Sequence, residues 1–175
     1  AAEGKTVLEV ARENGIDIPT LCYLKECGNV GKCGVCAVEI EGKNNLALAC
    51  LTKVEDGMVV RTDTEKVQER VKSRVSTILN KHEFKCGPCP RRENCELLKL
   101  VIKTKAKATT PFVVENKEEY VDIRSKSITI DRSKCILCGR CAAACTEKTG
   151  TSSIKLVNVN GKRIVTPEEQ KCFDE

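Results

Sequence analysis

The stretch CILCGRCAAAC, residues 135–145, carries the most specific pattern in this chain. Two residues separate each of its first three cysteines, and the fourth follows after three more. Thiols at these gaps can wrap a loop around one face of a cubane cluster, while the fourth turns away into the following segment. A zinc site would need two close pairs separated by a longer loop. The spacing therefore favours a [4Fe–4S] cluster.

The fourth cysteine, Cys145, leaves this pattern incomplete. In bacterial ferredoxins with two clusters it ligates the other cluster, and a second motif completes both. No second motif follows residue 145, and Thr146 stands where proline is usual. We expect Cys135, Cys138 and Cys141 to bind one [4Fe–4S] cluster and Cys145 a second, in a truncated chain. Alternatively Cys145 or Cys172 is a makeshift ligand; a Cys172 cap predicts four irons here, lost in Cys172→Ala.

The chain as a whole is rich in cysteine, with 13 among 175 residues. The number is odd, residues 1–10 do not have the positively charged and then apolar pattern of a leader, and no apolar run reaches membrane-spanning length. Metal ligands in the reducing cytoplasm are therefore favoured over a disulfide scaffold. The net charge of +5 comes from scattered lysines and arginines, and aromatic residues make up only 3%. We expect no nucleic-acid partner and no membrane span.

A second group comprises Cys22, Cys33, Cys36 and Cys50, with one close pair and two long gaps. It is similar in spacing to a binuclear [2Fe–2S] loop, with a lengthened first gap. Cys27 is an alternative to Cys22, disfavoured because Cys22 follows the rigid entry at Pro19. Gly28, Gly31 and Gly34 would let backbone amides approach the cluster. A four-cysteine zinc ribbon is the alternative, although ribbons normally use two close pairs.

A third group comprises His82, Cys86, Cys89 and Cys95. A lone histidine at a helix end is usually a surface or capping residue, but without His82 this group has only three protein thiols. Replacing a thiolate with imidazole removes a negative charge and raises a cluster's potential. The spacing predicts a His/Cys3 [4Fe–4S] cluster or a Cys3His zinc site.

Periodicity predicts a mixed α+β chain. Helices are expected at residues 6–13, 65–81 and 93–103, strands at 35–40, 58–61 and 128–130, and a hairpin at 154–165 around Asn160-Gly161. The segment 104–126 is polar and aperiodic, and we interpret it as a connector. The predicted regions are 1–63 for the [2Fe–2S] site, 64–104 for the helical His/Cys3 site, 105–126 for the connector, and 127–175 for the cubane sites.

Three stretches in this order resemble the N-terminal accessory region of clostridial-type iron-only (FeFe) hydrogenases. They are IPTLCYLKECGNVGKCGVCAVEIEG, HEFKCGPCPRRENCELLKLVIK and RSKCILCGRCAAAC. The resemblance implies a ferredoxin-like β-grasp domain with its first strand missing, a small helical domain, and part of a bacterial-ferredoxin domain. It assigns the ligands named above, and assigns none to Cys27 or Cys172.

The resemblance implies an electron relay in a cytoplasmic oxidoreductase. Electrons would come from ferredoxin or a redox partner subunit and continue to a hydrogenase domain that makes or oxidises H2. The chain alone would not be catalytic. The same modules occur in NADH dehydrogenase and NAD-dependent formate dehydrogenase, which are alternative parents. A structural zinc module is the alternative of another class.

Overall fold

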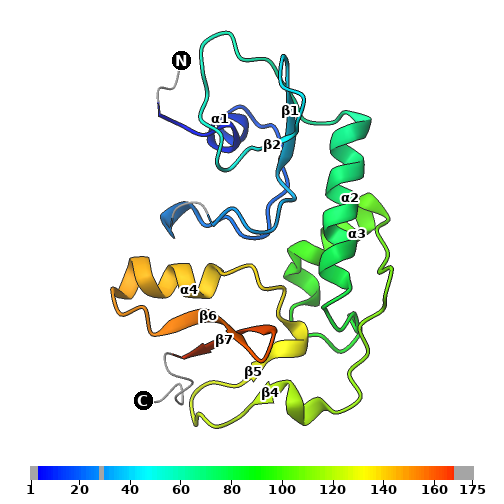
Figure 1. Cartoon of the computed structure of the whole chain (residues 1–175), viewed down its shortest axis with the longest axis vertical. Helices are drawn as coiled ribbons and strands as arrows, with labels where there is room; N and C mark the ends of the chain where they lie inside the picture. Colours follow the sequence, from blue (N-terminus) through cyan, green and yellow to red (C-terminus); the bar gives the residue numbers. More distant parts are fainter. Residues whose placement is uncertain (1–3, 28–29, 168–175) are drawn as a thin grey trace.

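A computed structural model describes residues 4–27 and 30–167. Helices and short antiparallel strands alternate along it, which confirms the expected mixture of α and β structure. Figure 1 shows the N-terminal region at one end, two helices along one side, and the last sheets at the other end. None of the described helices is both long and apolar enough to cross a bilayer.

The N-terminal region is a helix packed on a small sheet. Helix α1 (Val7–Glu13) begins at Thr6, whose hydroxyl accepts from the Glu9 N–H in a reciprocal capping box. Strand β1 (Ala37–Ile40) is central, paired antiparallel with β2 (Ala47–Leu48) and β3 (Val60–Arg61). The buried core beneath them contains apolar side chains and two thiols. These are Val7, Leu8, Ala11, Ile18, Tyr23, Cys36, Val38, Ile40, Ala49 and Cys50.

Two helices form the middle of the chain. Helix α2 (Glu65–Leu79) confirms the helix expected at residues 65–81, and it buries an apolar stripe of Val67, Val71, Val75 and Leu79. A 3₁₀ turn, η2 (Arg92–Asn94), and helix α3 (Glu96–Thr104) occupy the segment predicted as one helix. The break falls at Cys95, whose extended backbone ends the turn and begins α3. Leu97 and Leu100 of α3 pack into the same core as the α2 stripe.

The segment predicted as a connector contains regular structure. It holds the 3₁₀ turn η3 (Lys117–Glu119) and strand β4 (Val121–Asp122), which pairs with β5 (Ile130–Asp131). Sequence periodicity missed β4 because a two-residue strand has no detectable alternation.

The C-terminal region carries the third ligand loop. The 3₁₀ turn η4 (Arg132–Lys134) leads through the loop to α4 (Arg140–Ala144) and one π-helical turn, η5 (Cys145–Thr149). Strands β6 (Ile154–Val159) and β7 (Lys162–Pro167) form the predicted hairpin, with Asn160 and Gly161 at positive φ.

The ligand loop of the N-terminal region contacts the C-terminal region. Its 3₁₀ turn η1 (Lys25–Cys27) contacts α4 and η5, and in Figure 1 this blue segment lies between the first sheet and α4. Leu21, Cys22 and Cys33 share a core with the α2 stripe, and Cys138 packs against it. The fold therefore brings the three ligand groups toward one another.

Candidate iron–sulfur sites

The four thiols of the Cys22 group are buried and arranged as two pairs. The Sγ atoms of Cys36 and Cys50 are 3.4 Å apart, and the Cys33 N–H donates to Cys22 Sγ at 3.5 Å. Each of the four side chains is less than 9% exposed. Two thiolates bound to one tetrahedral metal at about 2.3 Å lie roughly 3.8 Å apart. Two such pairs fit the two irons of a [2Fe–2S] cluster.

One thiol of each pair is prepared to lose its proton. The hydrogen bond from Cys22 lowers the pKa of Cys33 to about 5, and the bond from Cys50 lowers that of Cys36 to about 7. In return, the same bonds raise the pKa values of Cys22 and Cys50. Thiolates are the form that binds iron, so the hydrogen bond within each pair favours the ligating form of one of its two thiols.

Glycines shape the loop around Cys33. Gly34 adopts φ +70°, and a Cβ there would lie 2.9 Å from Arg74 Nε. The absence of a side chain lets Arg74 Nε donate to the Cys33 carbonyl at 3.1 Å, which ties α2 to the loop. Gly31 is also at positive φ, while Gly28 lies outside the described residues.

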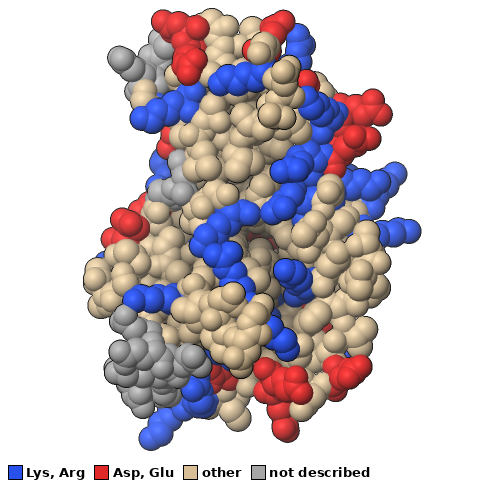
Figure 2. Space-filling model, viewed as in Figure 1, with Lys and Arg blue, Asp and Glu red and all other residues tan. Residues whose placement is uncertain are grey.

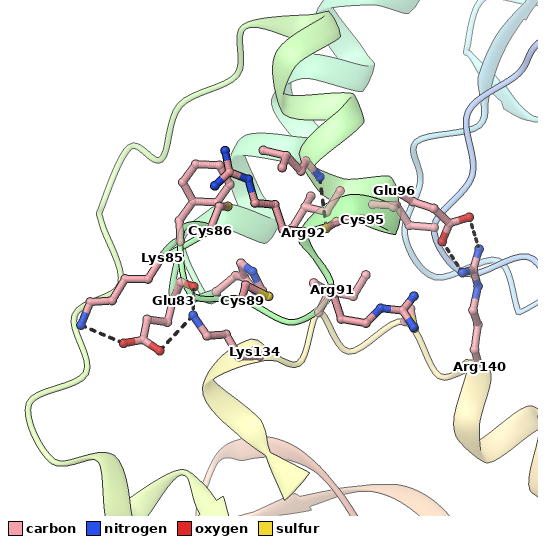
Figure 3. Close-up of a pocket in the computed structure, with 17 residues that line it drawn as sticks. Glu83, Lys85, Cys86, Cys89, Arg91, Arg92, Cys95, Glu96, Lys134 and Arg140 are labelled. Atoms are coloured by element: carbon pink, nitrogen blue, oxygen red, sulfur yellow. Dashed lines mark hydrogen bonds and ion pairs between the residues drawn. The ribbon is translucent and has the colours of Figure 1, made fainter.

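The four members of the His82 group line one cavity of about 280 Å³. Figure 3 shows Cys86, Cys89 and Cys95 around it, with Arg140 reaching across from α4. The Nδ1 atom of His82 is buried there and has no hydrogen-bond partner among the described residues. An orphaned ring nitrogen beside three thiols is suited to bind iron.

The surroundings keep the His82 ring neutral. Burial, and then the Lys134 charge, lowers the pKa of His82, which leaves a ring lone pair available. Cys95 is the N-cap of α3, and its Sγ accepts from the Leu98 N–H at 3.4 Å. This hydrogen bond fixes the position of the Cys95 thiol at the beginning of the helix.

Cys135, Cys138 and Cys141 lie around the loop that precedes α4. Leu137 at φ +55° turns its N–H toward Cys135 Sγ, at 3.4 Å. Burial raises the pKa of Cys135 and Cys141. Bound iron would reverse this effect, because a metal stabilises the thiolate.

Cys145 has a different environment, at the end of α4. Its Sγ lies 3.4 Å from Thr151 Oγ1 and 3.7 Å from Thr149 Oγ1, and the Thr151 bond is the main cause of a pKa lowered to about 7. Cys27 lies in η1 and is half-buried. Cys172 lies outside the described residues.

Glu83, which sequence reasoning missed, follows His82 directly and is 6% exposed. Its carboxylate accepts from Lys117 Nζ at 2.9 Å and from Ser133 Oγ at 3.1 Å, and pairs with Lys134 and Lys85. Lys117, above all, holds the pKa of Glu83 far below its ordinary value. The network joins three chain segments behind the histidine, and no local sequence signal marks it.

No three His, Cys, Asp or Glu side chains within residues 4–27 and 30–167 converge closely enough to bind a single metal ion. A structural zinc module is not favoured, because the family models that match this chain bind iron–sulfur clusters.

Three protein-family models match consecutive parts of the chain. Residues 1–65 match a 2Fe-2S iron-sulfur cluster binding domain. Residues 66–106 match the iron hydrogenase 1-like, iron-sulfur centre-binding domain, and residues 127–149 match a 4Fe-4S binding domain.

Relatives share this order over nearly the whole chain. The chain is 55% identical to iron hydrogenase 1 of Clostridium pasteurianum over 174 residues, 99% of this chain and 30% of that protein. It is 31% identical to the gamma chain of the NAD-reducing hydrogenase HoxS of Cupriavidus necator, covering 91% of this chain and 67% of that relative. A crystal structure of NAD+-reducing [NiFe]-hydrogenase in the H2-reduced state superposes with TM-score 0.83 at 25% identity, covering 96% of this chain and 70% of that one.

These matches and the arranged thiols define an iron–sulfur electron-transfer protein that binds [2Fe–2S] and [4Fe–4S] clusters. The chain belongs to the family of iron–sulfur relay regions shared by iron hydrogenases, NAD-reducing hydrogenases and NADH-quinone oxidoreductases. It spans about a third of the length of iron hydrogenase 1.

Proposed function

We propose that the three ligand groups hold separate clusters. Cys22, Cys33, Cys36 and Cys50 would bind [2Fe–2S]; His82, Cys86, Cys89 and Cys95 would bind [4Fe–4S]; Cys135, Cys138 and Cys141 would bind another [4Fe–4S], with Cys145 donating to a further cluster. The paired thiols of the first group and the orphaned His82 nitrogen support these assignments.

The same assignments divide the chain into a β-grasp ferredoxin-like region at 1–63, a helical region at 64–104, a connector at 105–126, and a bacterial-ferredoxin-like region from 127. The sheet built on β1 and the α2–α3 pair support this division.

One observation supports the relay: the cavity of the His82 group is also lined by residues from the segments of the other two groups. Cys138 of the third group lines it, and so does Leu21, which directly precedes Cys22. Electrons could therefore pass between the groups through a few packed side chains. The protein would position the clusters, exclude water and set their potentials.

We propose that this relay serves an iron-only hydrogenase and continues to a catalytic domain that interconverts protons and H2. The 55% identity to iron hydrogenase 1 supports this parent. NADH dehydrogenase is the alternative, supported by 36% identity to a component of the NADH-quinone oxidoreductase of Rhizobium meliloti. A cytoplasmic location fits the free thiols, which a reducing compartment preserves.

An acidic electron carrier such as ferredoxin would dock over the Cys22 group. A groove of about 580 Å³ runs along the ligand loop at Gly31 and Gly34, and its cationic lining consists of Lys32, Lys66, Arg70 and Arg74. Figure 2 shows Lys and Arg gathered across the middle of this face, with acidic side chains toward its edges. Leu51, 51% exposed and adjacent to Gly31, adds an apolar contact beside ligand Cys50.

Iron and acid-labile sulfide analysis, with electron paramagnetic resonance of the reduced protein, tests the cluster assignments. We expect equal iron and sulfide, and separate signals for binuclear and cubane clusters. Zinc without sulfide would end the proposal.

Docking is tested by charge reversal. Arg70→Glu should slow reduction by an acidic carrier about tenfold at low ionic strength, and the difference should shrink with salt. Lys162→Glu, on the β6–β7 hairpin and outside the lining of the groove, is the control and should not change the rate. An equal effect of both variants would exclude this groove as the docking site.

A further inference from the structure

Arg140 lies where the three ligand groups meet. It is the first residue of α4 and sits between Cys138 and Cys141 in sequence. Its guanidinium pairs with Glu96, the residue after ligand Cys95, and Nη2 donates to Glu96 Oε1 at 3.2 Å. Figure 3 shows the side chain extending from α4 to the beginning of α3. One ion pair thus joins the second and third ligand segments.

The Nε–H group of Arg140 is buried and has no acceptor among the described residues. Leaving a buried donor unsatisfied costs about 1–3 kcal/mol, and more for a charged group. Arg140 also lines the cavity that contains the His82 group and Cys138. A cluster bound in this cavity would supply such acceptors, namely sulfide and cysteinyl sulfur.

Arg140 is close to two of the ligand groups. It follows Cys138 of the third group by two residues, and it borders the cavity of the second group. Arg91 and Arg92 also line the cavity but are exposed, so water screens their charges more strongly.

We propose that Arg140 is a positioning residue that sets the reduction potential at the junction of the relay. Its Nε–H donates to a sulfur of the cluster bound through Cys138, and its charge stabilises that cluster's reduced state. Hydrogen bonds to sulfur and nearby positive charge both raise a cluster's potential. Electrons arriving from either neighbouring site are then held at the junction. This inference rests on the cluster assignments proposed above.

The test is a redox titration of the cluster-loaded, full-length protein, followed by electron paramagnetic resonance. Arg140→Gln should lower the reduced-to-oxidised ratio of the Cys138 cluster about tenfold at fixed potential, equivalent to about 59 mV for one electron. Arg140→Lys keeps the charge and should restore part of this loss. Arg163→Gln, at an exposed position of β7, should leave all potentials unchanged.

The variant Glu96→Gln distinguishes an effect of the Arg140 charge on the potential from a structural effect of losing the ion pair. Both Arg140→Gln and Glu96→Gln break the same ion pair, so a merely structural role predicts shifts in the same direction. The proposal predicts opposite signs, because loss of the Glu96 charge leaves Arg140 uncompensated and raises the potential. Shifts of the same sign, or none from Arg140→Gln, would overturn it. Iron and sulfide contents stay at the wild-type level if only this inference fails, whereas a parent protein without clusters refutes the proposed function itself.

Discussion

The N-terminal region and the C-terminal region hold their cysteines in different ways. In the first, all four thiols are buried, and apolar residues such as Leu8 and Val38 fill the core around them. In described residues 127–167, the buried apolar side chains are Val165 and Pro167, and Cys141 is exposed. The first site is therefore supported by a core of its own, while the third depends on ligands and neighbouring segments.

The difference shows how much each region needs its cluster. Burial of apolar side chains stabilises a fold without metal, at about 25 cal/mol per Å² removed from water. A region with little such burial must gain its stability from metal binding or from packing against its neighbours. Metal removal and substitutions in the two regions can test this difference.

Removal of iron should have the largest effect. Chelation is expected to increase amide hydrogen exchange in β6, β7 and α4 more than about a hundredfold, since little else holds them. Exchange in α1 and β1 should increase much less, because their apolar core remains. Exchange measured by mass spectrometry on loaded and chelated protein checks this, and equal increases in both regions would contradict it.

Loss of one ligand should abolish the binuclear cluster. Cys22→Ala is expected to remove the [2Fe–2S] signal, because Cys33 then has no partner thiol at the same iron. Cys27→Ala is the matched control from the same loop and should leave the signal intact. Iron content and paramagnetic resonance are the measurements. A lost signal in Cys27→Ala with a retained one in Cys22→Ala would reverse the assignment.

Glu83 links the middle of the chain to the C-terminal region, so its loss should weaken that region first. Glu83→Gln is expected to destabilise the protein by about 2 kcal/mol at pH 7, because buried hydrogen bonds to a carboxylate are lost. The folded pKa of Glu83 lies below its ordinary value of 4.5. Its contribution is therefore complete above pH 4.5 and is lost as the pH falls further.

Denaturant unfolding of wild type and Glu83→Gln at pH 7 and below pH 4 checks this sign. The difference in free energy of unfolding between the two proteins should be smaller below pH 4 than at pH 7. Glu118→Gln, at an exposed carboxylate next to Lys117 in the chain, is the control and should change stability little. A larger difference in free energy of unfolding below pH 4 would contradict a stabilising role of the ionised Glu83 carboxylate.

The smallest effect is expected from a ligand exchange that keeps the cluster. His82→Cys should preserve the [4Fe–4S] cluster of the cavity but lower its potential, because a thiolate adds negative charge. A redox titration measures the shift. An unchanged potential would show that His82 is not a ligand.

Much of the local structure could be predicted from the sequence. Helix α2 and the Asn160-Gly161 turn are encoded by neighbouring residues, and the structure confirms both. The short strand β4 could not be predicted, because its position depends on pairing with β5 rather than on its own two residues. The break before α3 also escaped prediction, since it depends on the backbone conformation at Cys95.

The sequence by itself determined which residues could bind clusters, because ligand type and close spacing are local properties of the chain. Only the tertiary structure decided how these ligands are grouped in space. The contact of Cys36 with Cys50, the ion pair of Arg140 with Glu96 and the hydrogen bond of Ser133 to Glu83 join residues between 14 and 50 positions apart. Such contacts depend on how the elements pack, and no pattern of neighbouring residues records them.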